Sequence, residues 1–231
     1  MNRMQRLASW TGGLMLAFAA SSTFAFTTID TLSGWDGSTG VSTFGILNTA
    51  TYGQTVTVPA GEGTLTSFSF AMNLPATVAF RGEVYAWDSV NGLATGAALY
   101  ESAPTQTAGT GFQVVTFTIP GGVPVVPGQQ YVIFATNSRD QAGHSGGGAW
   151  GQVGGSPYAG GAFVFINNGP DPTQWTSTAW SQNFLGAGGD LAFRATFGAA
   201  VPTPALNEYV MMTMGVLLAL TGFFFLRRRS R

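Results

Sequence analysis

Apolar and polar residues alternate through the middle of the chain, and the alternation is clearest from Val78 to Trp87. A period of two residues is typical of a β-strand, in which successive side chains point to opposite faces. The stretch therefore predicts a strand with two distinct faces. One face carries Val78, Phe80, Val84 and Ala86, and the other carries Arg81, Glu83, Tyr85 and Trp87.

Seven further short strands are predicted, at residues 43–47, 54–58, 65–72, 112–119, 130–136, 162–166 and 190–197. Turn residues such as Asn91-Gly92 and Pro127-Gly128 separate them, and no stretch of the domain keeps a helical spacing. This pattern favours an all-β fold, a two-sheet β-sandwich with a jelly-roll order rather than an immunoglobulin-like one. Residues 117–133 also resemble a strand pair that is common in extracellular jelly-roll modules.

Residues 201–231 follow a different pattern, which has three parts. A short proline-containing motif comes first, an uncharged run at residues 209–226 follows, and an arginine cluster ends the chain. At about 1.5 Å per residue the run reaches roughly 27 Å as a helix, close to the ~30 Å bilayer core. The run therefore predicts a single transmembrane helix. A buried helix of a soluble domain is the alternative, and it would need a polar face that this run lacks.

The arginine cluster, residues 227–231, predicts the orientation of this helix. Basic residues next to a membrane helix stay preferentially in the cytoplasm, so the preceding domain is expected outside. The cluster consists of Arg227, Arg228, Arg229 and Arg231.

The motif at residues 203–209 reads Thr203-Pro204-Ala205-Leu206-Asn207-Glu208-Tyr209. With the apolar span and the basic end, it resembles the IPTL-CTERM sorting signal of Gram-negative bacteria, a relative of the PEP-CTERM signals. The family pattern is Ile-Pro-Thr-Leu-Ser-Glu-Trp-Gly. This chain keeps Pro204, Leu206 and Glu208, substitutes at Asn207 and Tyr209, and departs at Thr203, Ala205 and Val210.

The resemblance covers about thirty residues. It implies an exosortase-type membrane protease as partner, cleavage near the motif, and delivery to the cell surface or extracellular matrix.

The N-terminus predicts export as well. Arg3 and Arg6 precede an apolar stretch from Leu7 to Ala20, and Thr23-Phe24-Ala25 places small residues where signal peptidase reads them. We predict a signal peptide at residues 1–25, cleaved after Ala25, with an uncleaved N-terminal anchor as the alternative. The exported domain is then residues 26–200, enough for one well-buried domain.

Composition narrows the function of this domain. Its three arginines and nine acidic residues give a net charge of −6, which disfavours nucleic-acid binding. The chain has no cysteine, so the domain has no disulfide framework. His144 is its only histidine, which excludes any zinc site with two imidazoles.

Two carboxyls among Glu62, Glu83, Glu101 and the aspartates could still form a glycosidase acid–base pair, and convergence of Glu83 and Glu101 in an open cleft would favour that activity. Glu83 lies two residues from Arg81 on one strand face, so an ion pair between them is the simpler expectation. We predict a non-enzymatic protein. The glycine-rich run from Gly143 to Gly161 lacks lysine and a following helix, so it is interpreted as a surface loop rather than a phosphate loop.

Aromatic residues suggest an alternative role, the recognition of a polysaccharide. Flat rings stack on sugar C–H faces, and the chain has several rings on one strand face or in loops. The candidates are Tyr85, Trp87, Trp150, Tyr158, Trp175 and Trp180. The competing interpretation is that these rings seal the ends of the sandwich and cover its sheet.

Calcium is the one cofactor that the turns suggest, because carboxylates in loops of extracellular β-modules are its usual ligands. The candidate ligands are Asp36, Asp88 and Asp140. Aspartates in such turns more often accept hydrogen bonds from their own backbone. The sequence thus favours an exported, briefly membrane-anchored surface or matrix protein, with no metal or catalytic centre.

Overall fold

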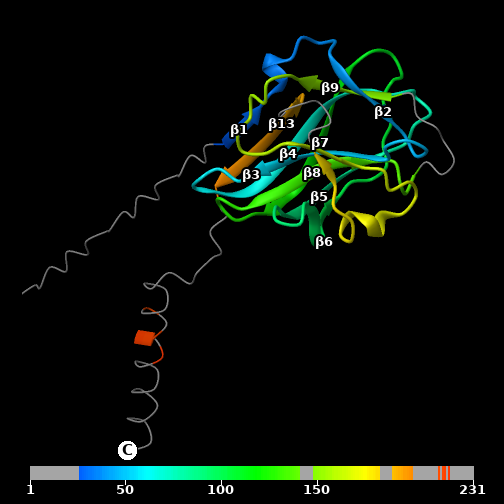
Figure 1. The fold of residues 1–231 in the computed structure, drawn as a ribbon. Coiled ribbons are helices and arrows are strands. Elements are labelled where there is room, and N and C mark those ends of the chain that lie inside the picture. The colour runs from blue at the N-terminus through cyan, green and yellow to red at the C-terminus, as the bar shows by residue number, and fades with distance from the viewer. Residues whose placement is uncertain are drawn as a thin grey trace, which may run out of the picture.

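The computed structural model describes residues 26–140, 148–182 and 189–199, together with residues 213, 215, 216 and 218. Two antiparallel sheets pack face to face and form a sandwich (Figure 1). The predicted all-β, two-sheet architecture is therefore confirmed.

The first sheet has the strand order β1-β13-β4-β9-β12, with β7 also paired to β4 and β2 paired to β9. Its strands are β1 (Phe26–Asp30), β2 (Gly40–Phe44), β4 (Glu62–Asn73), β7 (Gln113–Pro124), β9 (Gly148–Val153), β12 (Asp190–Leu191) and β13 (Phe193–Ala199).

The second sheet has the order β11-β10-β3-β8-β5-β6. Its strands are β3 (Thr51–Thr57), β5 (Arg81–Asp88), β6 (Leu93–Glu101), β8 (Gln130–Thr136), β10 (Phe163–Ile166) and β11 (Ser181–Gln182). Two short 3₁₀ helices complete the described elements, η1 (Leu32–Gly34) and η2 (Pro172–Trp175).

The main core lies between the two sheets. Phe68 and Phe197 of the first sheet and Val84 and Ile133 of the second are all buried there. On β5 the residues next to Val84 point the other way, as the alternation predicts. Tyr85 and Trp87 are nevertheless buried, because they belong to a second apolar cluster that includes Trp175 of η2. Both faces of this strand are thus covered.

The glycine-rich run predicted as a surface loop contains strand β9, so that prediction is wrong for residues 148–153. Trp150 in its middle is fully buried. The glycines permit close packing: a Cβ added to Gly148 would lie 2.2 Å from the Leu74 side chain, and one added to Gly151 would lie 2.8 Å from Ala71. Glycine here serves contact between neighbouring strands rather than flexibility.

The first strand of the sandwich begins, and its last strand ends, at the same pole of the fold. β1 pairs antiparallel with β13, so Phe26 stands opposite Gly198, and Ala199 stands opposite Glu62. We call this end the terminal pole; in Figure 1 it is where the blue β1 begins and the orange β13 ends. β3 ends at Thr57, shortly before β4 begins, so Thr57 also lies at the terminal pole. Thr51, at the other end of β3, lies at the opposite pole, which we call the distal pole.

The predicted signal peptide at residues 1–25 and the sorting motif at residues 203–209 lie outside the described residues. Within the predicted membrane span, residues 213, 215, 216 and 218 are described, and they are helical. In the part of the chain that the structure describes, no helix has the length and apolar character needed to cross a bilayer.

Candidate functional site

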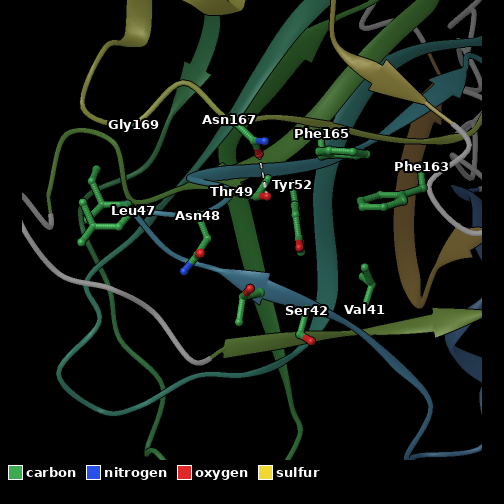
Figure 2. A pocket seen from close by; sticks show the side chains of 12 residues that line it. Val41, Ser42, Leu47, Asn48, Thr49, Tyr52, Phe163, Phe165, Asn167 and Gly169 are labelled. Carbon is green, nitrogen blue, oxygen red and sulfur yellow. Dashed lines mark hydrogen bonds between the residues drawn. The ribbon is translucent and has the colours of Figure 1, made fainter.

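A pocket opens at the distal pole, where β2 and the turn after it separate from β3 and β10 (Figure 2). Its volume is about 670 Å³. Small-molecule sites usually measure roughly 300–1,000 Å³, so the pocket is large enough for a small ligand. It draws on two stretches that are far apart in sequence, residues 41–52 and 163–169.

One wall of the pocket is aromatic. Phe165 stands opposite Tyr52 in the β10–β3 register, and Phe163 lies two residues away, so the three rings share a face. Phe163 and Phe165 stack with centroids 5.7 Å apart, and Tyr52 meets the Phe163 ring edge-on at 5.3 Å. Tyr52 and Phe163 are buried, whereas Phe165 is half-buried at the pocket.

Burial raises the pKa of Tyr52 to about 12, and the Thr49 side chain opposes this shift. The phenol therefore stays neutral at physiological pH and keeps its hydroxyl as a hydrogen-bond donor.

The rim of the pocket is polar and uncharged. Ser42, Thr43 and Thr49 supply hydroxyls, and Asn48 and Asn167 supply amides. The Thr49 hydroxyl donates to Oδ1 of Asn167 over 2.7 Å, the bond drawn in Figure 2. Among the described residues that line the pocket, none carries a charge.

Hydrogen bonds within the turn hold this rim in place. The Gly45 N–H donates to the Thr49 carbonyl and the Asn48 N–H donates to the Gly45 carbonyl, each over 2.9 Å. The Asn137 amide, oriented so that both its polar atoms are satisfied, accepts from the Ile46 N–H and donates to the Ala50 carbonyl at 3.1 Å. The pocket is thus largely formed before any ligand binds.

A cluster of charged residues also lies at the distal pole. Asp140 accepts from Nε and Nη2 of Arg81 at 2.7 and 2.5 Å, and Glu101 pairs with both Arg81 and Arg139. The expected ion pair between Arg81 and Glu83 is therefore replaced by pairs of Arg81 with Asp140 and Glu101. Arg139 lies over the Trp175 ring, 5.0 Å from its centroid, and this contact ties the cluster to η2.

Glu83 occupies the inner side of this cluster. Its side chain is fully buried, Arg139 Nη1 lies 3.8 Å from its Oε1, and neither oxygen has a hydrogen-bond partner among the described residues. Burial raises its pKa to about 8, and the charge of Arg139 opposes the shift. Glu101 is its cross-strand partner. A buried acid cannot reach a substrate, so the geometry of this pair does not favour glycosidase chemistry.

Four of the six predicted aromatic residues come together, but in a buried cluster. Each of the four exposes 9% or less of its surface: Tyr85, Trp175 and Trp180 pack around Phe134, and Trp87 packs on Trp180. Residues 167–180 lie over the outer face of the second sheet, where Nε1 of Trp175 donates to the Thr51 hydroxyl over 3.1 Å. For these four rings the structure therefore agrees with the competing interpretation, in which the rings cover the sheet.

The other two predicted rings lie apart from this cluster. Trp150 is fully buried in the main core. Tyr158 is half-buried, and its hydroxyl accepts from the Thr57 N–H over 2.9 Å. A role of the six rings in polysaccharide binding stays a prediction.

The three aspartates suggested for calcium do not meet. Asp36 accepts from the N–H groups of Ser38 and Thr39, and hydrogen bonds from Thr39 lower its pKa to about 2. Asp88 accepts from its own turn in the same way, and Asp140 pairs with Arg81. Across residues 26–140, 148–182 and 189–199, no group of three or more histidine or acidic side chains could hold a metal. Calcium binding stays a prediction.

Comparison with known proteins gives little further information. No protein-family model and no curated protein matches the chain. One similar solved structure is the clostridial cysteine protease Cwp84 after propeptide cleavage, with a TM-score of 0.46, 12% identity, and coverage of 71% of this chain and 38% of that one.

A second structure, of the cysteine protease and lectin-like domains of Cwp84, a surface layer associated protein of Clostridium difficile, has a TM-score of 0.44 and 11% identity. The match covers 66% of this chain and 32% of that one. The chain therefore spans about a third of the proteins it matches, and likeness at this level carries no information about activity.

Proposed function

We propose that the chain is a non-enzymatic surface or extracellular-matrix protein that is exported, briefly anchored and then processed. Signal peptidase removes residues 1–25, the helix at residues 209–226 holds the chain in the inner membrane, and an exosortase-type protease cleaves near residues 203–209. The sandwich is then released or attached outside the cell.

The observation that carries this proposal is the position of the two predicted signals relative to the sandwich. β1 begins at Phe26, directly after the predicted cleavage site, and β13 ends at Ala199, shortly before the sorting motif. These strands are neighbours in the same sheet. Cleavage of both signals would therefore leave all described strands of both sheets in place.

The absence of enzymatic activity is part of the proposal. Glu83 is fully buried, and Glu101 is held by two arginines, so this pair offers no accessible acid and base. The single histidine in the sequence leaves no second imidazole for a zinc centre with two histidine ligands.

We also propose that the sandwich is a jelly roll. The orders β1-β13-β4-β7 and β3-β8-β5-β6 support this, because successive strands of this frame alternate between the sheets, except for the β5–β6 hairpin, as in two interlocked Greek keys. β2 and the strands β9 to β12 form an addition to this eight-strand frame.

Recognition of a polysaccharide is the second candidate function. The observation that favours it is the preformed distal pocket with its aromatic wall and neutral polar rim. This pocket supports such a role better than the buried cluster around Trp175 does.

Mass spectrometry of the protein recovered outside its own cells tests the main proposal. We expect two losses of mass, one of residues 1–25 and one that includes Arg227–Arg231. Replacing Pro204 and Glu208 by alanine should block the second loss, whereas Pro202→Ala, outside the motif, should leave it unchanged. A mature protein that keeps the arginine cluster would instead indicate a permanent tail anchor.

A further inference from the structure

We propose that the distal pocket binds an uncharged saccharide. The inference deepens the second candidate function and rests on export of the sandwich, which brings the pocket into contact with extracellular glycans. It assigns ligand binding to residues that the sequence alone did not single out.

The first argument concerns charge. A charged ligand group that leaves water needs an opposite charge or several hydrogen bonds at its destination. The residues that line the pocket offer hydroxyls and amides but no charged partner. The exported domain also has a net charge of −6, which repels acidic polysaccharides. An uncharged ligand avoids both costs.

The second argument concerns the distribution of polar and apolar groups. A sugar ring presents C–H groups on its faces and hydroxyls around its edge. The half-buried Phe165 ring, which packs on the buried rings of Tyr52 and Phe163, suits the C–H faces, and the rim amides both donate and accept hydrogen bonds as the hydroxyls require. A purely apolar ligand would leave Asn48 and Asn167 desolvated without partners.

Asn167 is the residue best placed to form a hydrogen bond with a ligand hydroxyl. Its Oδ1 accepts from the Thr49 hydroxyl over 2.7 Å, which holds the side chain at the rim. Its side-chain nitrogen has no hydrogen-bond partner within the described part of the chain and lies at the pocket rim, as Figure 2 shows. An amide held in this way can donate to a ligand at little entropic cost.

The position of the pocket agrees with a role in recognition. It lies beside Thr51 at the distal pole, whereas both ends of the sandwich lie at the terminal pole. A sandwich held by either end therefore presents the pocket away from its point of attachment.

The test uses the full chain, purified in detergent and applied to an array of neutral and acidic oligosaccharides. The strongest neutral oligosaccharide is then titrated calorimetrically against the parent chain and its variants. We expect neutral glycans to bind and acidic ones not to. Asn48→Trp places a bulky ring at the exposed rim and should weaken binding by about tenfold or more, and Asn167→Ala by about threefold to tenfold.

Val90→Trp is the matched control, because Val90 is 91% exposed in the β5–β6 turn, away from the pocket. Its affinity should equal that of the parent chain, and all variants should keep the parent's thermal midpoint. An array without neutral hits, a preference for acidic glycans, or equal affinities for Asn48→Trp and Val90→Trp would overturn the proposal. The mass measurement on the exported protein tests sorting separately, so either proposal can fail alone.

Discussion

The Glu83 carboxyl is the least compensated polar group in the charged cluster at the distal pole. Its two oxygens have no hydrogen-bond partner among the described residues, and the nearest cation, Arg139, is 3.8 Å away and shared with Glu101. Burial removes the carboxyl from water and destabilises its ionised form relative to the neutral acid, so the pKa of Glu83 rises to about 8. Near neutral pH Glu83 is therefore mostly protonated.

Protonation of Glu83 predicts a specific dependence of stability on pH. In the unfolded chain the acid ionises near the ordinary glutamate pKa of 4.5, whereas the folded chain keeps the proton up to about pH 8. The contribution of Glu83 is therefore most favourable below pH 4.5 and is lost as the pH rises to about 8. At about 1.4 kcal/mol per pKa unit, the loss between pH 5 and pH 8 is roughly 3 kcal/mol.

Glu83→Gln should remove this loss, since glutamine has no proton to release. Denaturant unfolding of both proteins at pH 5 and pH 8 measures the difference. As the pH rises from 5 to 8, the free energy of unfolding should fall less in the variant than in the parent. A smaller decline will remain in both proteins, because burial also raises the pKa of Asp190. Parallel pH profiles would show that Glu83 ionises equally in both states.

At the scale of the elements, the junction between β3 and β10 depends on a residue without a side chain. Gly161 precedes β10, and a Cβ there would lie 1.8 Å from the Thr55 carbonyl oxygen, a backbone atom that cannot rotate away. The adjacent bond from the Thr55 N–H to the Ala162 carbonyl, 2.9 Å long, pairs these two segments. Close approach of the backbones therefore requires glycine.

Gly161→Ala should consequently destabilise the protein by about 2–3 kcal/mol, because the two segments must separate to admit a methyl group. Gly154→Ala is the matched control: a Cβ there meets nothing within 4 Å and its φ is not positive. That variant should be neutral or slightly stabilising. Urea unfolding of the two variants compares them directly, and equal midpoints would contradict the close contact.

Strands whose apolar residues alternate or form a continuous run could be predicted from the sequence, and glycine-rich ones could not. The strand predicted at residues 130–136 has the bounds of β8, since every residue there packs between neighbouring strands. β9 escapes prediction because its glycines resemble a loop until Leu74 and Ala71 are placed beside them. The strand predicted at residues 43–47 is also misplaced, because β2 ends at Phe44 and the chain then turns.

The candidate site was the least predictable part, for a related reason. The pocket combines residues 41–52 with residues 163–169, and only the β10–β3 register brings them together. The sequence singles out the tryptophans, but their burial depends on where residues 167–180 fold. No local pattern specifies that path.

For the molecule as a whole, the start of β1 and the end of β13 at one pole predict the orientation of the anchored sandwich relative to the membrane. The turn at Val90 joins β5 to β6 near the Ala86–Tyr131 pair, at the end of the second sheet that belongs to the terminal pole. Asn48 lies at the distal pole. About seven strand residues separate the poles, or roughly 25 Å at about 3.4 Å per residue.

Fluorescence transfer to the membrane measures this arrangement, and the absence of cysteine makes the labelling specific. Val90→Cys and Asn48→Cys each provide one labelling site at an exposed position. With the full chain in vesicles that contain an acceptor lipid, the label at position 90 should transfer more energy than the label at position 48. The reason is that the chain leaves the sandwich at the terminal pole, nine residues before the proposed membrane helix.

A soluble acceptor is the control, since both exposed labels should transfer to it equally. Equal transfer to the lipid acceptor would mean that the sandwich tumbles freely on residues 200–208. Stronger transfer from position 48 would place the pocket against the bilayer, where an extracellular glycan could not enter, and would contradict the proposed presentation of the distal pole.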